Sequence, residues 1–284
     1  MSKVYEPASS SHASIADLTS PRAWRAGLLY GFAAYVIWGF IPIYFHILSS
    51  VQPIRILYHR IVWSALFMAV VVSFRGEWDS ILPVMRNAKN LAMLSAGALL
   101  IAANWLLFIY AVATSQLLQA SLGYFINPLL SVALGVIFLR ERLKAWQWVA
   151  VLLAFGAVLN LALRAGDFPW LALGLAGSFG FYGLVRKTID INSLHALTVE
   201  SVLLFPAALL ALLFGSTASL SRQTMGVLSL SGIITAVPLL CFGAALRRLP
   251  LSTMGFMQYV GPTLQFLVAV CLFREPLNRD KSLS

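Results

Sequence analysis

Nine apolar segments, each about 18–25 residues long, fill the chain from Trp24 to Phe273 and are separated by only a few residues. A helix needs roughly 20 apolar residues to cross the hydrocarbon core of a bilayer, which is about 30 Å thick. Hydrophobic residues make up 60% of the 284-residue chain and charged residues only 11%. A soluble domain of this size cannot bury that much apolar surface. The sequence therefore predicts an all-α polytopic membrane protein.

The nine segments divide the chain into closely connected helices. The expected spans are 24–48, 54–74, 91–113, 117–139, 146–163, 169–185, 196–214, 225–246 and 251–273. Connections such as residues 49–53 are so short that successive helices must be antiparallel neighbours. Residues 1–23 are polar and rich in serine, which predicts a disordered cytoplasmic tail.

The positive charges predict an orientation in the membrane. A net charge of +10 would suggest a nucleic-acid partner in a soluble protein, but here Lys and Arg lie between apolar segments, where they fix topology. A cytoplasmic N-terminus places on the inside Lys3, Arg22, Arg25, Arg75, Arg86, Lys89, Arg140, Arg142, Lys144, Arg186, Lys187, Arg247 and Arg248. The outside then receives only Arg164, Arg222, Arg274, Arg279 and Lys281. We expect the N-terminus to be cytoplasmic and no nucleic acid to bind.

An internal repeat relates two parts of the chain. Residues 98–144 align without a gap on residues 232–278, and eleven of the 47 positions are identical. The matched pairs include Pro128 with Pro262, both in the middle of a predicted helix, and Glu141 with Glu275. The third and fourth segments thus match the eighth and ninth, so each repeat unit has five helices.

An odd number of helices inverts the second copy relative to the first. Inverted repeats are typical of secondary transporters, whose substrate site lies near the membrane midplane between the halves. We expect residues 24–163 to form the first unit of five helices and residues 169–284 the second unit with four. The helix that matches 146–163 would begin near Asp280, so a tenth helix is missing, and the chain is either truncated or an impaired variant.

Several motifs resemble a known transporter family. They are AYVIWG at 34–39, HRIVWS at 59–64, NWLLF at 104–108, ASLGYFINPL at 120–129, FYGLVRK at 181–187, VPLLCF at 237–242 and QYVGPTL at 258–264. Together they resemble the RarD subgroup of the EamA family, in the drug/metabolite transporter superfamily. The resemblance covers nearly all of residues 24–280. It implies ten transmembrane helices in two EamA repeats, a bacterial inner membrane, and export or exchange of small metabolites or drugs.

Few charged side chains lie inside the predicted membrane segments. Glu200 is the one acidic residue within a segment, where an uncompensated charge costs roughly 2.5–3.5 kcal/mol. It is either a carboxylate that couples transport to protons or binds a cation, or a shallow residue that reaches the cytoplasmic surface. Arg60, about two turns into the second segment, either faces a cavity and attracts an anionic substrate or binds backbone carbonyls. Their depths differ, so we expect no ion pair between them; His59 is either titratable or a satisfied core residue.

Proline residues inside the predicted helices indicate kinks. A proline removes a hydrogen bond from the carbonyl four residues earlier, and in lipid that carbonyl needs another partner. Pro128 frees the carbonyl of Tyr124, Pro262 that of Gln258 and Pro42 that of Trp38. We expect these kinks either to line a cavity or to serve only packing. The candidate cavity residues are Trp38, His59, Arg60, Asn104, Trp105, Tyr124, Asn127, Tyr182, Gln258 and Tyr259.

These observations favour a secondary transporter that works by alternating access, with lipid and a small molecule as its partners. An intramembrane enzyme would need facing carboxylates, a metal-ligand cluster or a nucleophile beside a base, and the sequence offers none. Cys241 and Cys271 lie in apolar runs and have no metal-ligand or disulfide spacing. We therefore expect no cofactor. A channel or a non-transporting scaffold is the alternative, and the sequence does not determine the oligomeric state.

Overall fold

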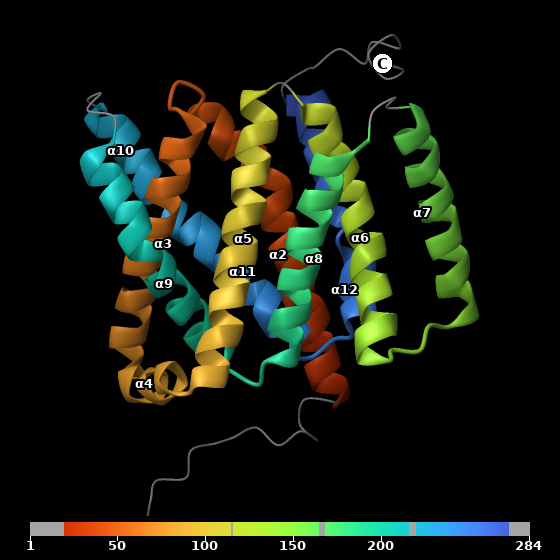
Figure 1. Ribbon diagram of the computed structural model, residues 1–284, viewed down its shortest axis with the longest axis horizontal. Coiled ribbons are helices and arrows are strands. Elements are labelled where there is room, and N and C mark those ends of the chain that lie inside the picture. Colours follow the sequence, from red (N-terminus) through yellow and green to blue (C-terminus); the bar gives the residue numbers. More distant parts are fainter. Residues whose placement is uncertain (1–19, 115, 165–167, 216–219, 273–284) are drawn as a thin grey trace, which may run out of the picture.

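The computed structural model describes residues 20–114, 116–164, 168–215 and 220–272, which form a bundle of helices (Figure 1). The described ranges contain no strand, so the predicted all-α architecture is confirmed there. The helices are α2 (Pro21–Ile47), α3 (Pro53–Arg75), α4 (Trp78–Arg86), α5 (Ala88–Ala113), α6 (Leu117–Leu139), α7 (Ala145–Arg164), α8 (Trp170–Thr188), α9 (Ser193–Phe214), α10 (Arg222–Ser229), α11 (Ser231–Leu246), α12 (Leu251–Met257), α13 (Val260–Leu267) and the π-helical η1 (Val268–Leu272).

Every predicted segment falls on one helix or on a run of consecutive helices. The structure differs from the prediction at three places. The segment at 225–246 is divided at Leu230 into α10 and α11, and the segment at 251–273 is divided into α12, α13 and η1. The short helix α4 was not predicted. Residues 1–19 of the predicted tail and the matched residue Glu275 lie outside the described residues.

Six helical stretches of the described chain have the length and hydropathy to cross a membrane. They are Pro21–Ile47, Pro53–Arg75, Ala88–Ala111, Leu122–Leu139, Ser193–Phe214 and Arg222–Leu246. The protein is therefore a multi-pass membrane protein. The count of nine membrane helices and the division into two inverted repeats stay predictions.

Local signals start and stop several of these helices. The Ser20 side chain accepts a hydrogen bond from the backbone N–H of Ala23 at 3.1 Å and caps α2, which has Pro21 as its first residue. Asn192 caps α9 in the same way, through the N–H of Leu194 at 3.0 Å. Helix α3 ends at Arg75, and Gly76 caps it with a left-handed φ of 64°. The chain leaves α3 at this glycine and continues into the short helix α4.

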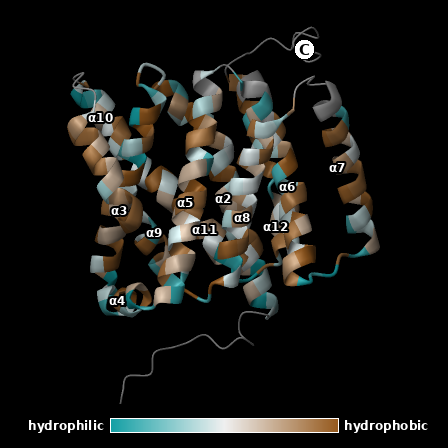
Figure 2. Ribbon diagram, viewed as in Figure 1, coloured by the Kyte–Doolittle hydropathy of each residue, from teal (hydrophilic) through white to brown (hydrophobic). Residues whose placement is uncertain are grey.

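The outer surface of the bundle is apolar along the helix shafts, as a lipid-facing surface must be. Phe74 is 89% exposed and Leu153 72%. Figure 2 shows hydrophobic residues along the helices and hydrophilic residues gathered at the two ends of the bundle. Helix α7 lies at the edge of the bundle, where its main contact is α6. The interior packs where α2, α8, α9 and α11 meet around Tyr182 and Phe242.

The proline positions differ in their effect on the helices. Helix α6 continues through Pro128, whereas the last segment breaks between α12 and α13, just before Pro262. The Gln258 carbonyl that Pro262 frees accepts the N–H of Gly261 at 3.1 Å. The protein itself therefore satisfies this carbonyl, and it is not left open to a cavity as one reading of the kinks expected.

The kink at Pro42 is satisfied by a neighbouring helix. The carbonyl of Trp38 accepts a hydrogen bond from Gln265 Nε2, on α13, at 3.2 Å. This bond ties α2 to α13 in the middle of the bundle. The carbonyls freed by Pro42 and Pro262 thus both have partners within the protein, and the lining of a cavity by the kinks stays a prediction.

Candidate functional site

A small cavity lies between α3, α5, α9 and α11, deep in the bundle. Its volume is about 20 Å³, enough for one water molecule. Most of the lining is apolar, but four polar side chains reach it. The lining residues are Ile61, Ser64, Ile101, Trp105, Leu197, Glu200, Ser201, Leu204, Thr235, Ala236 and Leu239. Two of them, Trp105 and Glu200, belong to the predicted set.

Glu200 forms a buried ion pair at one side of this cavity. Its Oε1 lies 3.6 Å from Nη1 of Arg186, on α8, and each of the two side chains is only 2% exposed. Tyr182 Oη donates a hydrogen bond to Glu200 Oε2 at 3.3 Å, and Arg186 Nη2 donates one to the carbonyl of Ser193 at 3.4 Å. The interpretation of Glu200 as a shallow residue that reaches the surface is therefore wrong.

The partner of Glu200 corrects a second expectation. From its position at the end of an apolar segment, Arg186 was expected to be a charge of a cytoplasmic connection. In the structure α8 continues to Thr188, and this extra turn carries Arg186 into the protein interior. Because the helix extends one turn past its apolar segment, a residue that was expected in a loop lies on the helix and is buried.

Arg60 contacts two residues that line the same cavity, Thr235 and Trp105. Its Nε donates a hydrogen bond to Thr235 Oγ1 at 3.0 Å. Its guanidinium carbon lies 4.8 Å from the ring centre of Trp105 and 5.6 Å from that of Phe45, both distances typical of cation–π contacts. Arg60 and Glu200 have separate partners, as their different depths predicted.

An aromatic cluster supports Tyr182, which donates to Glu200. Tyr182 stacks on Phe242 with ring centres 6.2 Å apart and an interplanar angle of 12°. Trp38 packs against Phe179 and Phe242, each at 5.7 Å. Tyr182 is fully buried. Trp38 and Tyr182 therefore lie in the packed core behind the ion pair and do not line the cavity.

The other predicted polar residues bond at separate places. Asn104 Nδ2 donates to the carbonyl of Leu175 at 2.9 Å and to Ser178 Oγ at 3.0 Å, which joins α5 to α8. Gln258, directly after α12, accepts through Oε1 from Ser131 Oγ, on α6, at 3.2 Å. Asn127 Oδ1, also on α6, is buried without a hydrogen bond to any described residue.

A second cavity has a volume of about 140 Å³. It is lined by Pro128, Leu129, Val132, Ala150, Val151, Ala154, Phe256 and Tyr259. Within the described residues, the hydroxyl of Tyr259 is buried without a hydrogen bond. Tyr124 is 37% exposed, with its ring 6.1 Å from that of Phe108, and His59 is 7% exposed on α3. The predicted residues thus do not meet in one cavity: Trp105 lines the first, Tyr259 lines the second, and Tyr124 lies at the surface.

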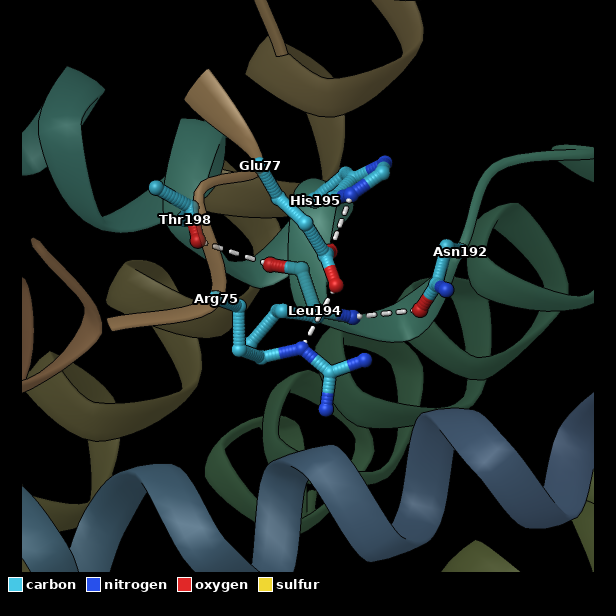
Figure 3. A network of polar contacts seen from close by, with 6 residues as sticks. All are labelled: Arg75, Glu77, Asn192, Leu194, His195 and Thr198. Carbon is cyan, nitrogen blue, oxygen red and sulfur yellow. Dashed lines mark hydrogen bonds and ion pairs between the residues drawn. The ribbon is translucent and has the colours of Figure 1, made fainter. Parts of the chain in front are cut away.

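A polar network joins the end of α3 to the start of α9 (Figure 3). Glu77 accepts a hydrogen bond from Arg75 Nε, and its Oε2 lies 2.7 Å from His195 Nε2. Partial burial alone would raise the pKa of Glu77, but the hydrogen bonds from Arg75 and His195 outweigh it and lower that pKa. The network fixes the first turn of α9, five residues before Glu200.

Comparison with known proteins places this geometry in a family. The sequence model of the EamA-like transporter family matches residues 25–163. Protein RarD of Escherichia coli is 46% identical over 266 residues, which cover 92% of this chain and 90% of that protein. An uncharacterized transporter of Bacillus subtilis, YojE, is 38% identical with the same coverage. The chain belongs to the RarD subgroup of the EamA family. It is a membrane transporter of the drug/metabolite type.

Two further relatives extend the comparison of this RarD-type chain. A protein of Pseudomonas aeruginosa described as chloramphenicol-sensitive protein RarD is 30% identical and covers 90% of this chain and 88% of its own length. A solved protein structure that is 16% identical superposes with a TM-score of 0.71 over 91% of this chain and 93% of that one. This second likeness shows the fold alone.

In this RarD-type transporter, the sequence predicted one member of the buried ion pair, Glu200, as a site residue but not the other, Arg186. Glu200 stood out because a carboxylate inside an apolar segment is rare. Arg186 lies beside Lys187 at the end of its segment and gave the ordinary signal of a topology-fixing charge. Among the described residues, no group of three or more His, Cys, Asp or Glu side chains is placed to hold a metal ion.

Proposed function

We propose that this RarD-type protein is a secondary active transporter that exports or exchanges small metabolites or drugs by alternating access. The cavity between α3, α5, α9 and α11 is the start of its substrate path, and Glu200 couples movement to protons. The N-terminus is cytoplasmic in a bacterial inner membrane. The observation that carries this proposal is a buried carboxylate that borders a cavity deep in the bundle.

The physical support lies in the cost of burying charges. Two ions in a low-dielectric interior lose several kcal/mol of hydration each, so hydrophobic packing is often the more stable choice at such a position. Charged residues inside membrane segments usually mark ion or proton pathways. Arg60 supplies a second charge beside Trp105, and this combination suits a flat solute with an anionic group.

The test is flux through the full chain in proteoliposomes, with and without an imposed pH gradient. The panel contains amino acids, aromatic metabolites and chloramphenicol. Saturable flux that the gradient accelerates supports a coupled transporter. Flux that rises linearly with concentration would instead indicate a channel, and a folded protein that transports nothing in the panel would favour a scaffold.

Glu200→Gln separates coupling from transport. The amide keeps the shape of the side chain but carries no charge and cannot take up a proton. We expect the pH gradient to lose its effect on accumulation, while exchange of labelled against unlabelled solute continues. Asp190→Asn is the matched control, because Asp190 is a 98% exposed carboxylate that pairs with Arg247 at 3.5 Å. Gradient-driven accumulation that persists in Glu200→Gln would exclude Glu200 from coupling.

A further inference from the structure

The contacts of the Arg186–Glu200 pair are unusually loose. Charge-assisted hydrogen bonds between a guanidinium and a carboxylate are about 2.7–2.9 Å long, whereas here the closest approach is 3.6 Å. Within the part of the chain that the structure describes, Glu200 Oε1 and Arg186 Nε and Nη1 are buried without any hydrogen bond. The carboxyl and guanidinium groups therefore face each other with several of their hydrogen-bonding positions unused.

This geometry is a poor one for stability alone. Each buried polar group without a partner costs about 1–3 kcal/mol, and more when it is charged. A buried ion pair offsets its desolvation only with good geometry and additional hydrogen bonds. The pair therefore needs an explanation other than stabilisation of the fold.

A glycine lies directly against each member of the ion pair. A Cβ atom at Gly97, on α5, would lie 2.8 Å from Glu200 Oε1. A Cβ atom at Gly243, on α11, would collide with Arg186 Nη2. Because neither glycine has a side chain, α5 and α11 approach the pair closely. On another side Glu200 borders the small cavity, whose lining is mostly apolar.

Two side chains of α8, Arg186 and Tyr182, contact the Glu200 carboxylate. The cavity that Glu200 borders is also lined by Thr235 on α11, whose hydroxyl accepts from Arg60, and by Ser64 on α3, whose hydroxyl donates to the carbonyl of Gly232. From α5, Ile101 and Trp105 line the same cavity and carry no charge. Among the described residues, Arg186 is the one cationic group within 4.0 Å of the Glu200 carboxylate.

We propose that Arg186 is the internal counter-cation of a proton site at Glu200. This inference rests on the proposed function. Glu200 alternates between two partners: Arg186, which lies 3.6 Å from its carboxylate, and a proton that arrives through the cavity. When the carboxylate takes up the proton it becomes a neutral acid, while Arg186 keeps its charge. The attraction between α8 and α9 is then lost, and the two helices are released to move against each other.

Arg186 is thus a positioning residue that acts through Glu200, and its effect on proton uptake can be measured without any substrate. The full chain is reconstituted in lipid, and the infrared band of protonated carboxyl groups is followed as a function of pH. The difference between the native protein and Glu200→Gln identifies the contribution of Glu200. Its midpoint gives the proton affinity of the site.

We expect Arg186→Met to raise the proton affinity of Glu200 about tenfold or more, since a nearby cation favours the ionised carboxylate. Arg186→Lys keeps a cation at the site and should give a smaller change. Arg247→Met is the matched control, because it removes an arginine whose partner, Asp190, lies at the protein surface. That control should leave the midpoint unchanged.

The outcomes separate this inference from the proposed function. An unchanged midpoint in folded Arg186→Met overturns the role of Arg186, whatever the flux assay gives. Should Arg186→Met fail to fold, Arg186→Gln, which also removes the charge, decides in the same way. A shifted midpoint in a protein that transports no solute would overturn the proposed function and leave Arg186 as the counter-cation of Glu200.

Discussion

Glu77 shows how a single side chain at the end of a helix connects two distant parts of the chain. It lies directly after α3, and its carboxylate joins Arg75 to His195 at the start of α9. Its side chain is 22% exposed, so water screens these interactions in part. Exposed ion pairs contribute at most about 1 kcal/mol, which is enough to align the first turn of a helix but not to hold a fold together.

The pH dependence of this contact follows from the lowered pKa of Glu77. A carboxyl whose pKa is lower in the folded protein than in the unfolded chain stabilises the fold above its unfolded pKa, about 4.3. That contribution is lost as the pH falls through the lower, folded value. We expect the thermal midpoint of the native protein in detergent to fall more steeply below about pH 4 than that of Glu77→Gln. Parallel curves for the two proteins would contradict this role.

Gly232, on α11, lies directly against the backbone of α3. A Cβ atom there would collide with the backbone carbonyl of Trp63, which has no flexible end that can move aside. We expect Gly232→Ala to destabilise the protein by about 1–3 kcal/mol, the usual cost of overpacking. Gly177→Ala, on α8, is the control, because no atom lies within 4 Å of its Cβ position. Equal thermal midpoints for the two variants would show that α3 and α11 separate without cost.

At the scale of whole helices, the start of α12 depends on a carboxylate from a distant part of the chain. Glu141, directly after α6, accepts the backbone N–H groups of Leu251 at 2.6 Å and Ser252 at 2.8 Å. The first N–H groups of a helix have no partner within the helix, and a negative charge there also suits the helix dipole. Glu141 therefore holds the beginning of α12 against the end of α6.

We expect Glu141→Ala to lower the free energy of unfolding by about 1.5–3 kcal/mol, the range for hydrogen bonds to a charged group. Glu141→Gln should cost less, because its one amide oxygen still accepts a hydrogen bond. Thermal unfolding of purified protein in detergent measures both. If the alanine variant is as stable as the native protein, other groups satisfy the start of α12.

For the whole molecule, the two ends of the bundle carry the charges that predict its orientation. Helices α4 and α10 lie at opposite ends (Figure 1). The end of the bundle that carries α4 has three basic residues near it in the chain, Arg75, Arg86 and Lys89. Basic residues favour the cytoplasmic side of the membrane. The orientation itself stays a prediction, because a helix bundle packs in the same way in either direction.

Cysteine labelling tests this orientation. The side chains of Ser80 on α4 and Gln223 on α10 are exposed, so a cysteine at either position is open to reagents. In a protein whose native Cys241 and Cys271 are replaced by serine, we expect a membrane-impermeant maleimide to label Gln223→Cys in intact cells. Ser80→Cys should react only after the membrane is opened. The reverse pattern would show that the N-terminus lies outside.

The sequence by itself determined the class of the protein, the approximate positions of its helices and the place of Glu200 inside an apolar segment. These features depend on local composition, since an apolar run of about 20 residues has one stable environment and a carboxylate within it is rare. The seven motifs between residues 34 and 264, taken together, indicated the family.

Only the tertiary structure decided which groups meet. Glu200 pairs with Arg186 on another helix, and Gln265 donates to the carbonyl of Trp38 on another helix. The glycines against the ion pair belong to two further helices. One further turn of α8 moved Arg186 from a presumed loop into the interior, and hydropathy does not report the end of a helix to within a turn. Contacts between helices depend on their rotation and depth in the bundle, and these are properties of the packed molecule and not of any one segment.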